Sequence, residues 1–174
     1  VAAAREVFEE CGVLLAGPDE HSVVQDLSDP SWQEDRTALE NHEIAFADML
    51  ILRGLVLRTD LLGLISNFCT PEFGTKRYDT FFFSALIPEG QVADGETSEA
   101  QIADWVTPAY AMRAGDAGNW LVLAPTVYNL TCIASAQNAK EFVETRRRLT
   151  RFMSYPIKKE DGTLMLHCDF PKRK

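Results

Sequence analysis

The sequence predicts an α+β fold, or a layered α/β/α arrangement, on three observations. Helical and strand-like patterns are mixed along the chain without a regular βαβ alternation. The chain has 174 residues, of which 46% are hydrophobic, so it can bury a core and is expected to form one domain. Near the end, Asp161-Gly162 stands between two strand-like runs, which is a hairpin signal.

The first element is a predicted helix that ends at Gly12. The opening residues 1–4 have high helical propensity, but no capping side chain stands before them. We therefore expect the helix to begin upstream and the chain to be the later part of a longer polypeptide. After Gly12, residues 13–15 are predicted to form a short strand, and GPDE to turn the chain.

The middle of the chain predicts two helices followed by strands. Apolar residues recur at helical spacing from Gln33 to Arg53, which predicts one long helix, and a shorter helix is expected from Thr59 to Ile65. The run RYDTFFFSALIPEG is rich in aromatic residues and predicts a buried strand. A further strand is expected at IADWV, residues 102–106.

The last third predicts helices and then a hairpin. Thr107-Pro108 has the cap-then-proline order of a helix start, and AYAMRAG is expected to be a short helix. LVLAPTVYNLTCIASA leads to AKEFVETRRRLTRFM, residues 139–153, which reads as an amphipathic helix with a basic end. Residues 155–171 are expected to contain the hairpin.

Charge and composition exclude several classes of protein. The formal net charge of −9 argues against a nucleic-acid-binding surface, which usually carries a basic patch. No apolar run reaches the roughly 20 residues of a membrane helix, so we expect no membrane partner. The four cysteines lie far apart with no CxxC pair, which favours reduced thiols and a cytoplasmic protein.

The first helix carries an unusual group of acids. A helix that ends at a glycine should have cations in its last turn, but this one has Glu6, Glu9 and Glu10, at positions i, i+3 and i+4. Their carboxylates emerge on one face, where oxygen ligands suit Mg²⁺ or Mn²⁺ and a substrate's phosphates complete the coordination. Arg5, four residues before Glu9, is expected to orient that side chain. The alternative is a solvated acidic helix face.

The segment REVFEECGV resembles the second half of the Nudix box, G-x5-E-x7-R-E-U-x-E-E-x-G-U, where U is aliphatic. The first half, G-x5-E, does not precede this segment in the given sequence. CTPE, RYDTFFFSALIPEG and ADWVTPAYAM resemble the CoA-diphosphatase-like branch of the Nudix hydrolases. The fixed positions of the half box are all filled, by Arg5, Glu6, Val7, Glu9, Glu10, Gly12 and Val13.

The resemblance implies a fold and an activity. The fold would be a Nudix α/β/α sandwich with a mixed sheet and a helical insertion after the Nudix helix. Residues 1–174 would form one such domain without its N-terminal strands and the first half of the box, and an upstream segment would pack against it. The activity would be hydrolysis of a nucleoside diphosphate linked to another group, CoA or a CoA derivative being one substrate.

Residue roles follow from the same resemblance. Glu6, Glu9 and Glu10 would be catalytic and would bind Mg²⁺ or Mn²⁺. In some members one of these glutamates, or a glutamate on a distant loop, is the general base; for the loop residue Glu96 and Glu99 are candidates and Glu99 is preferred. Each also reads as a solvated loop acid.

Other residues have two interpretations each. Arg77 and Tyr78 are candidate substrate contacts, although an ion pair or turn at a strand start explains them equally well. The arginines 146–148, with Arg151, either solvate a helix end or meet an extra phosphate of the substrate. A homodimer is left open. The alternative to an enzyme is a Nudix-fold module that binds a nucleotide without cleaving it.

Overall fold

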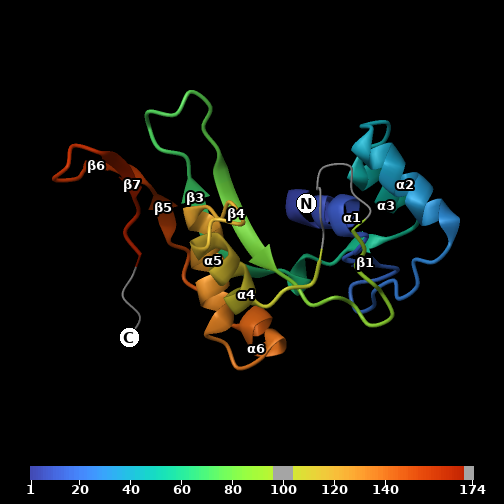
Figure 1. The fold of residues 1–174 in the computed structure, drawn as a ribbon. Coiled ribbons are helices and arrows are strands. Elements are labelled where there is room, and N and C mark those ends of the chain that lie inside the picture. Colours follow the sequence, from blue (N-terminus) through green and yellow to red (C-terminus); the bar gives the residue numbers. More distant parts are fainter. Residues whose placement is uncertain (96–103, 171–174) are drawn as a thin grey trace. The chain divides into compact units, whose positions relative to one another are not determined.

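The computed structural model describes residues 1–95 and 104–170, which form two compact units (Figure 1). The first unit contains Val1–Leu62 and Ala85–Trp105, and the second contains Gly63–Ser84 and Val106–Lys174. The expectation of a single domain over residues 1–174 stays a prediction.

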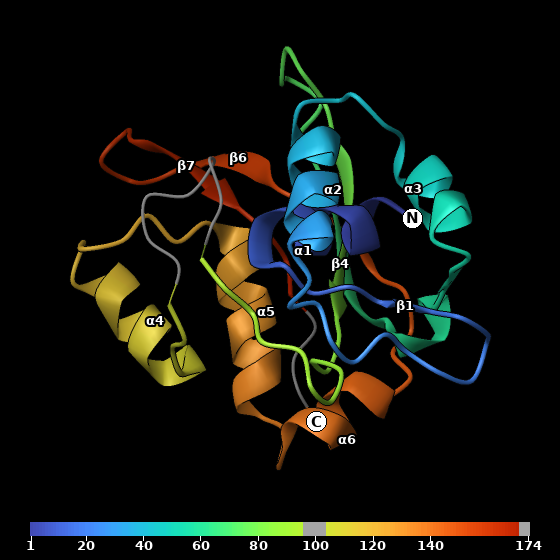
Figure 2. The same ribbon diagram turned by 90° about the vertical axis from the view of Figure 1, so that its right-hand side faces the viewer.

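The first unit is mainly helical. Its helices are α1 (Ala2–Cys11), α2 (Pro30–Glu40) and α3 (Phe46–Leu52), and α2 packs on α1 (Figure 2). A short antiparallel pair joins β1 (Ala16–Gly17) to β2 (Val56–Leu57), and a 3₁₀ turn, η1 (Thr59–Leu61), follows. The helix predicted to end at Gly12 is confirmed. The strand predicted at residues 13–15 is displaced, since pairing begins at Ala16.

The single helix predicted from Gln33 to Arg53 is wrong, because two helices occupy this segment. α2 begins earlier, at Pro30, where the side chain of Asp29 accepts a hydrogen bond from the Ser31 amide at 2.9 Å. His42, at φ 58°, has the left-handed backbone that ends helices. The apolar spacing continues across this break because Leu39 and Phe46 are buried in the same core.

The second unit is built on a mixed three-stranded sheet. β3 (Gly63–Cys69) pairs antiparallel with β4 (Asp79–Ser84) and parallel with β5 (Arg151–Met153), in the order β4-β3-β5. This confirms the α+β class with a mixed sheet. The unit also has α4 (Pro108–Asp116), α5 (Ala124–Ala134), α6 (Ala139–Glu144) and the hairpin strands β6 (Tyr155–Lys158) and β7 (Leu164–His167).

The helix predicted from Thr59 to Ile65 is wrong beyond its first turn. Only η1 is helical, and from Gly63 the chain forms β3, the central strand of the sheet. Pairing on both edges of β3 overrides the local preference. Phe68 of β3 lies at the centre of an aromatic cluster, with ring centroids 5.0 to 6.3 Å from those of Phe82, Tyr128, Phe152 and Phe170.

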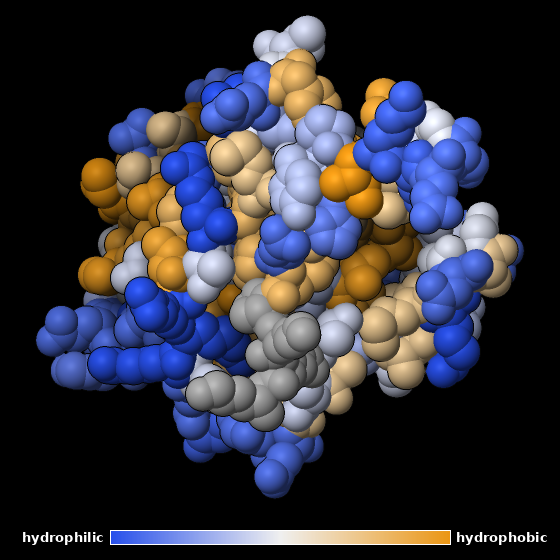
Figure 3. Space-filling view, turned by 90° about the vertical axis from the view of Figure 1, so that its left-hand side faces the viewer, coloured by the Kyte–Doolittle hydropathy of each residue, from blue (hydrophilic) through white to orange (hydrophobic). Residues whose placement is uncertain are grey.

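The strand predicted in RYDTFFFSALIPEG is confirmed as β4, but it is not buried in the described structure. Phe81 and Phe83 are 44% and 39% exposed. Apolar side chains reach the surface at several places on one face of the molecule (Figure 3). The exposed large hydrophobic residues of the second unit include Leu121, Leu123, Leu164 and Leu166.

The long helix predicted over residues 139–153 is wrong, since α6 ends at Glu144. Arg147 donates to the carbonyl oxygen of Phe142 at 2.7 Å and so binds the end of this helix. The chain then returns to the sheet as β5, because Phe152 joins the aromatic cluster. The predicted solvated arginine run therefore contains one half-buried structural residue.

Other predictions at the C-terminal end are confirmed. Thr107 caps α4 by accepting from the Tyr110 amide at 3.2 Å, with Pro108 in the first turn. β6 and β7 form the hairpin predicted at Asp161-Gly162, and Gly162 has φ 84°. Of the strand expected at 102–106, residues 104–106 are not strand, and the others lie outside the described residues. Within the described ranges, no helix is long and apolar enough to cross a membrane.

Candidate functional site

The candidate site is the C-terminal end of α1. Gly12 adopts φ 66° and ψ 18°, and its amide donates to the Phe8 carbonyl at 3.0 Å. The Val13 amide donates to the Val7 carbonyl at 3.4 Å, so two carbonyls near the helix end accept from the residues that follow it. The last turn of α1 contains no basic residue. The acids of the half box therefore gather at the negative end of the helix dipole.

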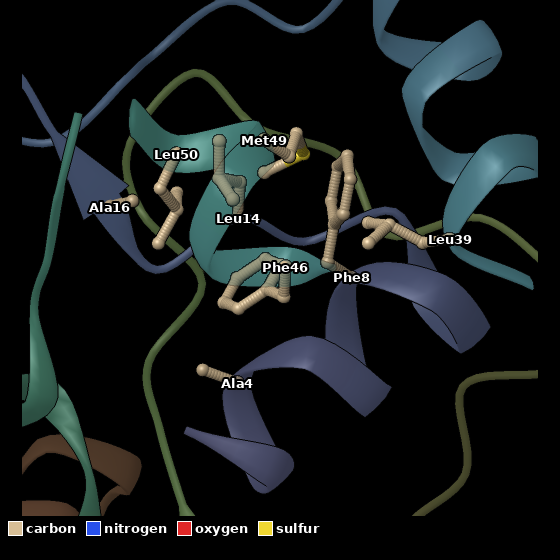
Figure 4. Close-up of a cluster of buried hydrophobic side chains, with 8 residues drawn as sticks. All are labelled: Ala4, Phe8, Leu14, Ala16, Leu39, Phe46, Met49 and Leu50. Carbon is tan, nitrogen blue, oxygen red and sulfur yellow. The ribbon is translucent and has the colours of Figure 1, made fainter. Parts of the chain in front are cut away.

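The apolar face of α1 anchors this helix in the core of the first unit. Phe8 is 1% exposed and points toward Leu39 of α2 and Met49 of α3 (Figure 4). Ala4, one turn earlier, is fully buried. Because the core fixes this face, the carboxylates project from the other side. The core cluster consists of Ala4, Phe8, Leu14, Ala16, Leu39, Phe46, Met49 and Leu50.

Arg36 of α2 supplies a cation to the end of α1. Its side chain is 1% exposed, and Nε donates to the Glu9 carbonyl oxygen at 2.7 Å. Nη1 lies 2.8 and 2.9 Å from the two carboxylate oxygens of Asp94. The Asp94 amide in turn donates to the Cys11 carbonyl at 3.0 Å. Two terminal carbonyls of α1 are thus bound by residues distant in sequence.

Gly12 is required by space as well as by its backbone. A Cβ atom there would lie 2.7 Å from Asp94 Oδ2 and 3.2 Å from Arg36 Nη1. The positive φ adds a cost of roughly 1–2 kcal/mol for any residue with a Cβ. The glycine of the half box therefore lets the ion pair of Arg36 and Asp94 pack directly against the helix end.

The three glutamates have different environments. Arg5 forms an ion pair with Glu9, as the sequence predicted, and lies 3.4 Å from Glu6 Oε1. The Glu9 side chain is 12% exposed, and its Oε1 is buried without a hydrogen-bond partner. The Glu6 side chain is 55% exposed, and Glu10 is also exposed. Arg5 thus holds Glu9 in place while the other two acids face solvent.

These residues fit a hard divalent cation by their chemistry. All three offer carboxylate oxygens, the ligands that Mg²⁺ and Mn²⁺ prefer, and Glu9 Oε1 has no hydrogen-bond partner among the described residues. Across residues 1–95 and 104–170, however, no three His, Cys, Asp or Glu side chains converge as a ready-made cation site. Binding a cation here would therefore need the exposed acids to turn toward Glu9.

Cys11 lies beside the acids but is a poor nucleophile. Burial raises the pKa of its thiol, and the negative charge of Glu10 raises it further. The guanidinium of Arg36 lowers the pKa by a smaller amount. The thiol therefore stays protonated near neutral pH. The chemistry of this site is that of its carboxylate oxygens and not that of the Cys11 sulfur.

A cavity of about 280 Å³ opens beside this helix end. Gly12, Arg36 and Asp94 line it, and Phe8 and Trp32 provide apolar walls. The cavity therefore adjoins the turn that carries Glu9 and Glu10, entirely within the first unit. Its other lining residues are Asp26, Leu27, Ser28, Asp29, Pro30, Gln33, Gly90, Gln91 and Val92.

The remaining predicted site residues lie elsewhere in the chain. Arg77 and Tyr78 end the loop between β3 and β4 in the second unit, where Arg77 Nε lies 3.4 Å from the Thr70 carbonyl oxygen. The Tyr78 amide donates to Thr70 Oγ1 at 3.0 Å, and its side chain is 63% exposed. Glu96 and Glu99 lie outside the described residues.

Sequence reasoning missed three residues that organise the site. Arg36 and Asp94 form the ion pair under Gly12. Gln91 bonds through its side-chain amide to both the amide and the carbonyl of Leu14, each at 2.9 Å, as a neighbouring strand would. The contact between Arg36 and the Glu9 carbonyl spans 27 residues, so neighbouring residues do not indicate it. The one signal in the sequence was that the last turn of α1 lacks a cation of its own.

Comparisons with known proteins connect the chain with Nudix hydrolases. No protein-family model matches it. Over 138 residues it is 26% identical to a Caenorhabditis elegans protein named "Putative nudix hydrolase 7". That match covers 79% of this chain and 44% of the relative, so the chain spans less than half the length of the curated relative it matches.

The fold is similar to that in the crystal structure of a NUDIX hydrolase from Alicyclobacillus acidocaldarius. The TM-score is 0.65 at 24% identity, and the match covers 82% of this chain and 64% of the other. Sequence and fold thus agree, and the predicted resemblance of the chain to Nudix hydrolases is confirmed, although not to the CoA-diphosphatase-like branch in particular.

Proposed function

We propose that this protein is a divalent-metal-dependent diphosphatase that hydrolyses a nucleoside diphosphate linked to another group. The observation that carries the proposal is the end of α1, where Glu6, Glu9 and Glu10 lie within one and a half turns of a helix held by Arg36. Its relatives in sequence and in fold carry the name of Nudix hydrolases, which supports hydrolysis in general.

In this proposal the three glutamates hold Mg²⁺ or Mn²⁺ and Arg5 orients Glu9. A bound divalent cation supplies charge neutralisation at the diphosphate oxygens and a lower pKa for the attacking water. Arg36 keeps the end of α1 fixed through the Glu9 carbonyl, so the carboxylate of Glu9 starts from a rigid backbone.

The finer assignments extend the same proposal. Glu99 is the proposed general base, and Arg77 and Tyr78 are proposed substrate contacts. CoA or a CoA derivative is the proposed substrate, on the segments that resemble the CoA-diphosphatase-like branch. The proposed location is the cytoplasm, with no nucleic-acid or membrane partner.

The second candidate is a Nudix-fold module that binds a nucleotide without cleaving it. One observation favours it: in the described ranges the acids do not converge, and Glu9 is already paired with Arg5. In such a module the cavity beside Gly12 would still bind a ligand, while the carboxylates would remain a solvated helix face.

The test is hydrolysis of a panel of diphosphates with Mg²⁺, with the products identified by mass. The panel contains CoA, ADP-ribose, NADH and a dinucleoside polyphosphate. The double variant Glu9→Gln with Glu10→Gln should lose hydrolysis, while Glu34→Gln, an exposed glutamate of α2, should retain it. Release of 3',5'-ADP and 4'-phosphopantetheine would support CoA. Turnover of ADP-ribose alone would reject CoA, and tight nucleotide binding with no turnover would support the module.

A further inference from the structure

A second cavity, of about 540 Å³, lies within the second unit. Its size falls within the range of about 300–1,000 Å³ that is usual for small-molecule sites. None of its lining residues belongs to α1 or to the first unit. The residues that line it are Phe68, Cys69, Thr70, Pro71, Tyr78, Thr80, Phe82, Val122, Leu123, Ala124, Pro125, Ser154, Leu166 and Cys168.

The wall of this cavity is mostly apolar. Phe68 and Phe82 contribute aromatic surface from β3 and β4, and their rings pack edge to face at 5.9 Å. Leu123 precedes α5, and Leu166 belongs to β7; they add aliphatic surface although they are 60% and 58% exposed. Removing such exposed apolar surface from water would favour a ligand with an apolar body.

Two arginines contact Cys69, one of the residues that line the cavity. Cys69 lines the cavity, and two guanidinium groups contact its sulfur, Arg151 Nη2 at 3.2 Å and Arg77 Nη2 at 3.8 Å. Arg151 also pairs with Asp79 at 3.2 Å, whereas the hydrogen bonds of Arg77 are to neutral groups, the Cys69 sulfur and the Thr70 carbonyl. Arg77 and Arg151 therefore bring two positive charges next to Cys69, and Asp79 pairs with one of them.

We propose that this cavity binds a small molecule with an apolar body and an oxyanion head group. The apolar body would lie between β3, β4, the start of α5 and β7. The head group, a carboxylate or a phosphate, would lie at the Cys69 end, where Arg77 and Arg151 donate charge-assisted hydrogen bonds to it. The hydroxyl of Thr70, which also lines this end, supplies a further polar group.

This site is independent of the acids on α1. The two proposals share only Arg77 and Tyr78, which are also the proposed substrate contacts in hydrolysis. The experiment therefore measures ligand binding without metal and without hydrolysis, both in the unaltered protein and in the variant that carries Glu9→Gln and Glu10→Gln.

The probes are dodecanoate, dodecyl phosphate and dodecanol, titrated calorimetrically below the concentrations at which they form micelles. Both anions should bind, and the tighter one identifies the preferred head group. Dodecanol should bind about tenfold more weakly than the better anion, because it lacks the charge that the arginines recognise. The variant of Glu9 and Glu10 should bind as the unaltered protein does.

Two sets of substitutions locate the bound probe. Ala124→Trp places a large side chain in the cavity from an exposed position at the start of α5, and should weaken binding of all three probes. Arg77→Gln with Arg151→Gln should weaken the anions about tenfold and leave dodecanol unchanged. Arg113→Gln, an exposed arginine of the same unit, is the matched charge control and should change nothing.

The proposal is overturned if neither anion binds, or if the anions bind no more tightly than dodecanol. Binding that survives both Ala124→Trp and the double arginine variant would also overturn it, because the probe would then lie elsewhere. Far-ultraviolet circular dichroism identifies any variant that has lost its fold, and the exposed arginine pair keeps the proposal testable if Ala124→Trp does not fold.

Discussion

The side chain of Arg36 donates through Nε to the main-chain oxygen of Glu9 at 2.7 Å, across 27 residues of sequence. This contact explains how α1 tolerates glutamates in its last turn. The positive charge that the helix end requires comes from α2 and is buried, while Glu6 and Glu10 lie on the exposed surface of α1. A helix end normally balanced by its own lysines or arginines is here balanced by another helix.

Gly12→Ala should destabilise the protein by about 2–5 kcal/mol. The positive φ contributes roughly 1–2 kcal/mol, and the contact with Asp94 Oδ2 adds the cost of an overpacked site, about 1–3 kcal/mol. Urea denaturation followed by circular dichroism measures the change.

Gly54→Ala is the matched control for this substitution. Gly54 has the same φ of 66°, and nothing lies within 4 Å of the position that a Cβ atom would occupy there. Gly54→Ala should therefore lower the free energy of unfolding only by the cost of the positive φ, roughly 1–2 kcal/mol. Equal losses for the two variants would show that the ion pair under Gly12 has no steric role.

Arg36→Met should cost about 2–4 kcal/mol of stability. Removing one partner of a buried pair leaves the other without compensation, although Asp94 is 39% exposed and solvent reduces the loss. Arg36→Lys keeps the charge but lacks the planar fork that reaches both Glu9 and Asp94, so it should lose less than Arg36→Met. An unfolding free energy of Arg36→Met equal to that of the unaltered protein would contradict this role.

Removing one partner of the buried hydrogen bond between Ser66 and Asn129 should lower the free energy of unfolding by about 1–3 kcal/mol. Ser66 Oγ donates to Asn129 Oδ1 at 2.7 Å, and both residues are at most 8% exposed. Ser66→Ala leaves the buried Asn129 amide with an unmet acceptor. The double variant with Asn129→Leu should recover part of the loss. Additive losses in this cycle would show that the two side chains do not interact.

The pH dependence of Cys11 alkylation should report on cation binding. Because burial and the charge of Glu10 raise the pKa of the thiol, the folded protein should be alkylated at higher pH than the protein in urea. The contribution of Cys11 to the stability of the fold is fully present at pH values below the pKa of its thiol in the unfolded protein. It is lost as the pH rises through the pKa of the thiol in the folded protein. Iodoacetamide labelling as a function of pH, with the Cys11 peptide followed by mass, measures the midpoint pH of the alkylation.

Mg²⁺ should lower this midpoint, because a cation on Glu10 cancels its charge while burial remains. Glu10→Gln should lower the midpoint without Mg²⁺ and abolish the response to it. A response to Mg²⁺ that persists in Glu10→Gln would mean that the cation acts elsewhere.

The sequence predicted well those features that depend on nearby residues. The end of α1 at Gly12, the Thr107 cap and the hairpin at Asp161-Gly162 each follow from residues within a few positions of one another. The pairing of Arg5 with Glu9 was predicted for the same reason, since the two residues meet on one helix face.

Features that depend on distant partners were not predicted. Ile65 belongs to a strand rather than a helix because β3 pairs on both edges, with β4 and with β5. Phe152 lies in a strand for a similar reason, since its ring contacts Phe68. Likewise, nothing in the segments around Arg36 and Asp94 indicates that these two residues, 58 positions apart, form an ion pair against Gly12.

Titration with Mn²⁺ tests the central claim, that the acids at the end of α1 bind a divalent cation. Calorimetry on the unaltered protein and on Glu34→Gln should show the same affinity, while the double variant Glu9→Gln with Glu10→Gln should bind at least about tenfold more weakly. Circular dichroism confirms that the double variant, which loses the ion pair with Arg5, remains folded. An unchanged Mn²⁺ affinity in a folded double variant would contradict the account.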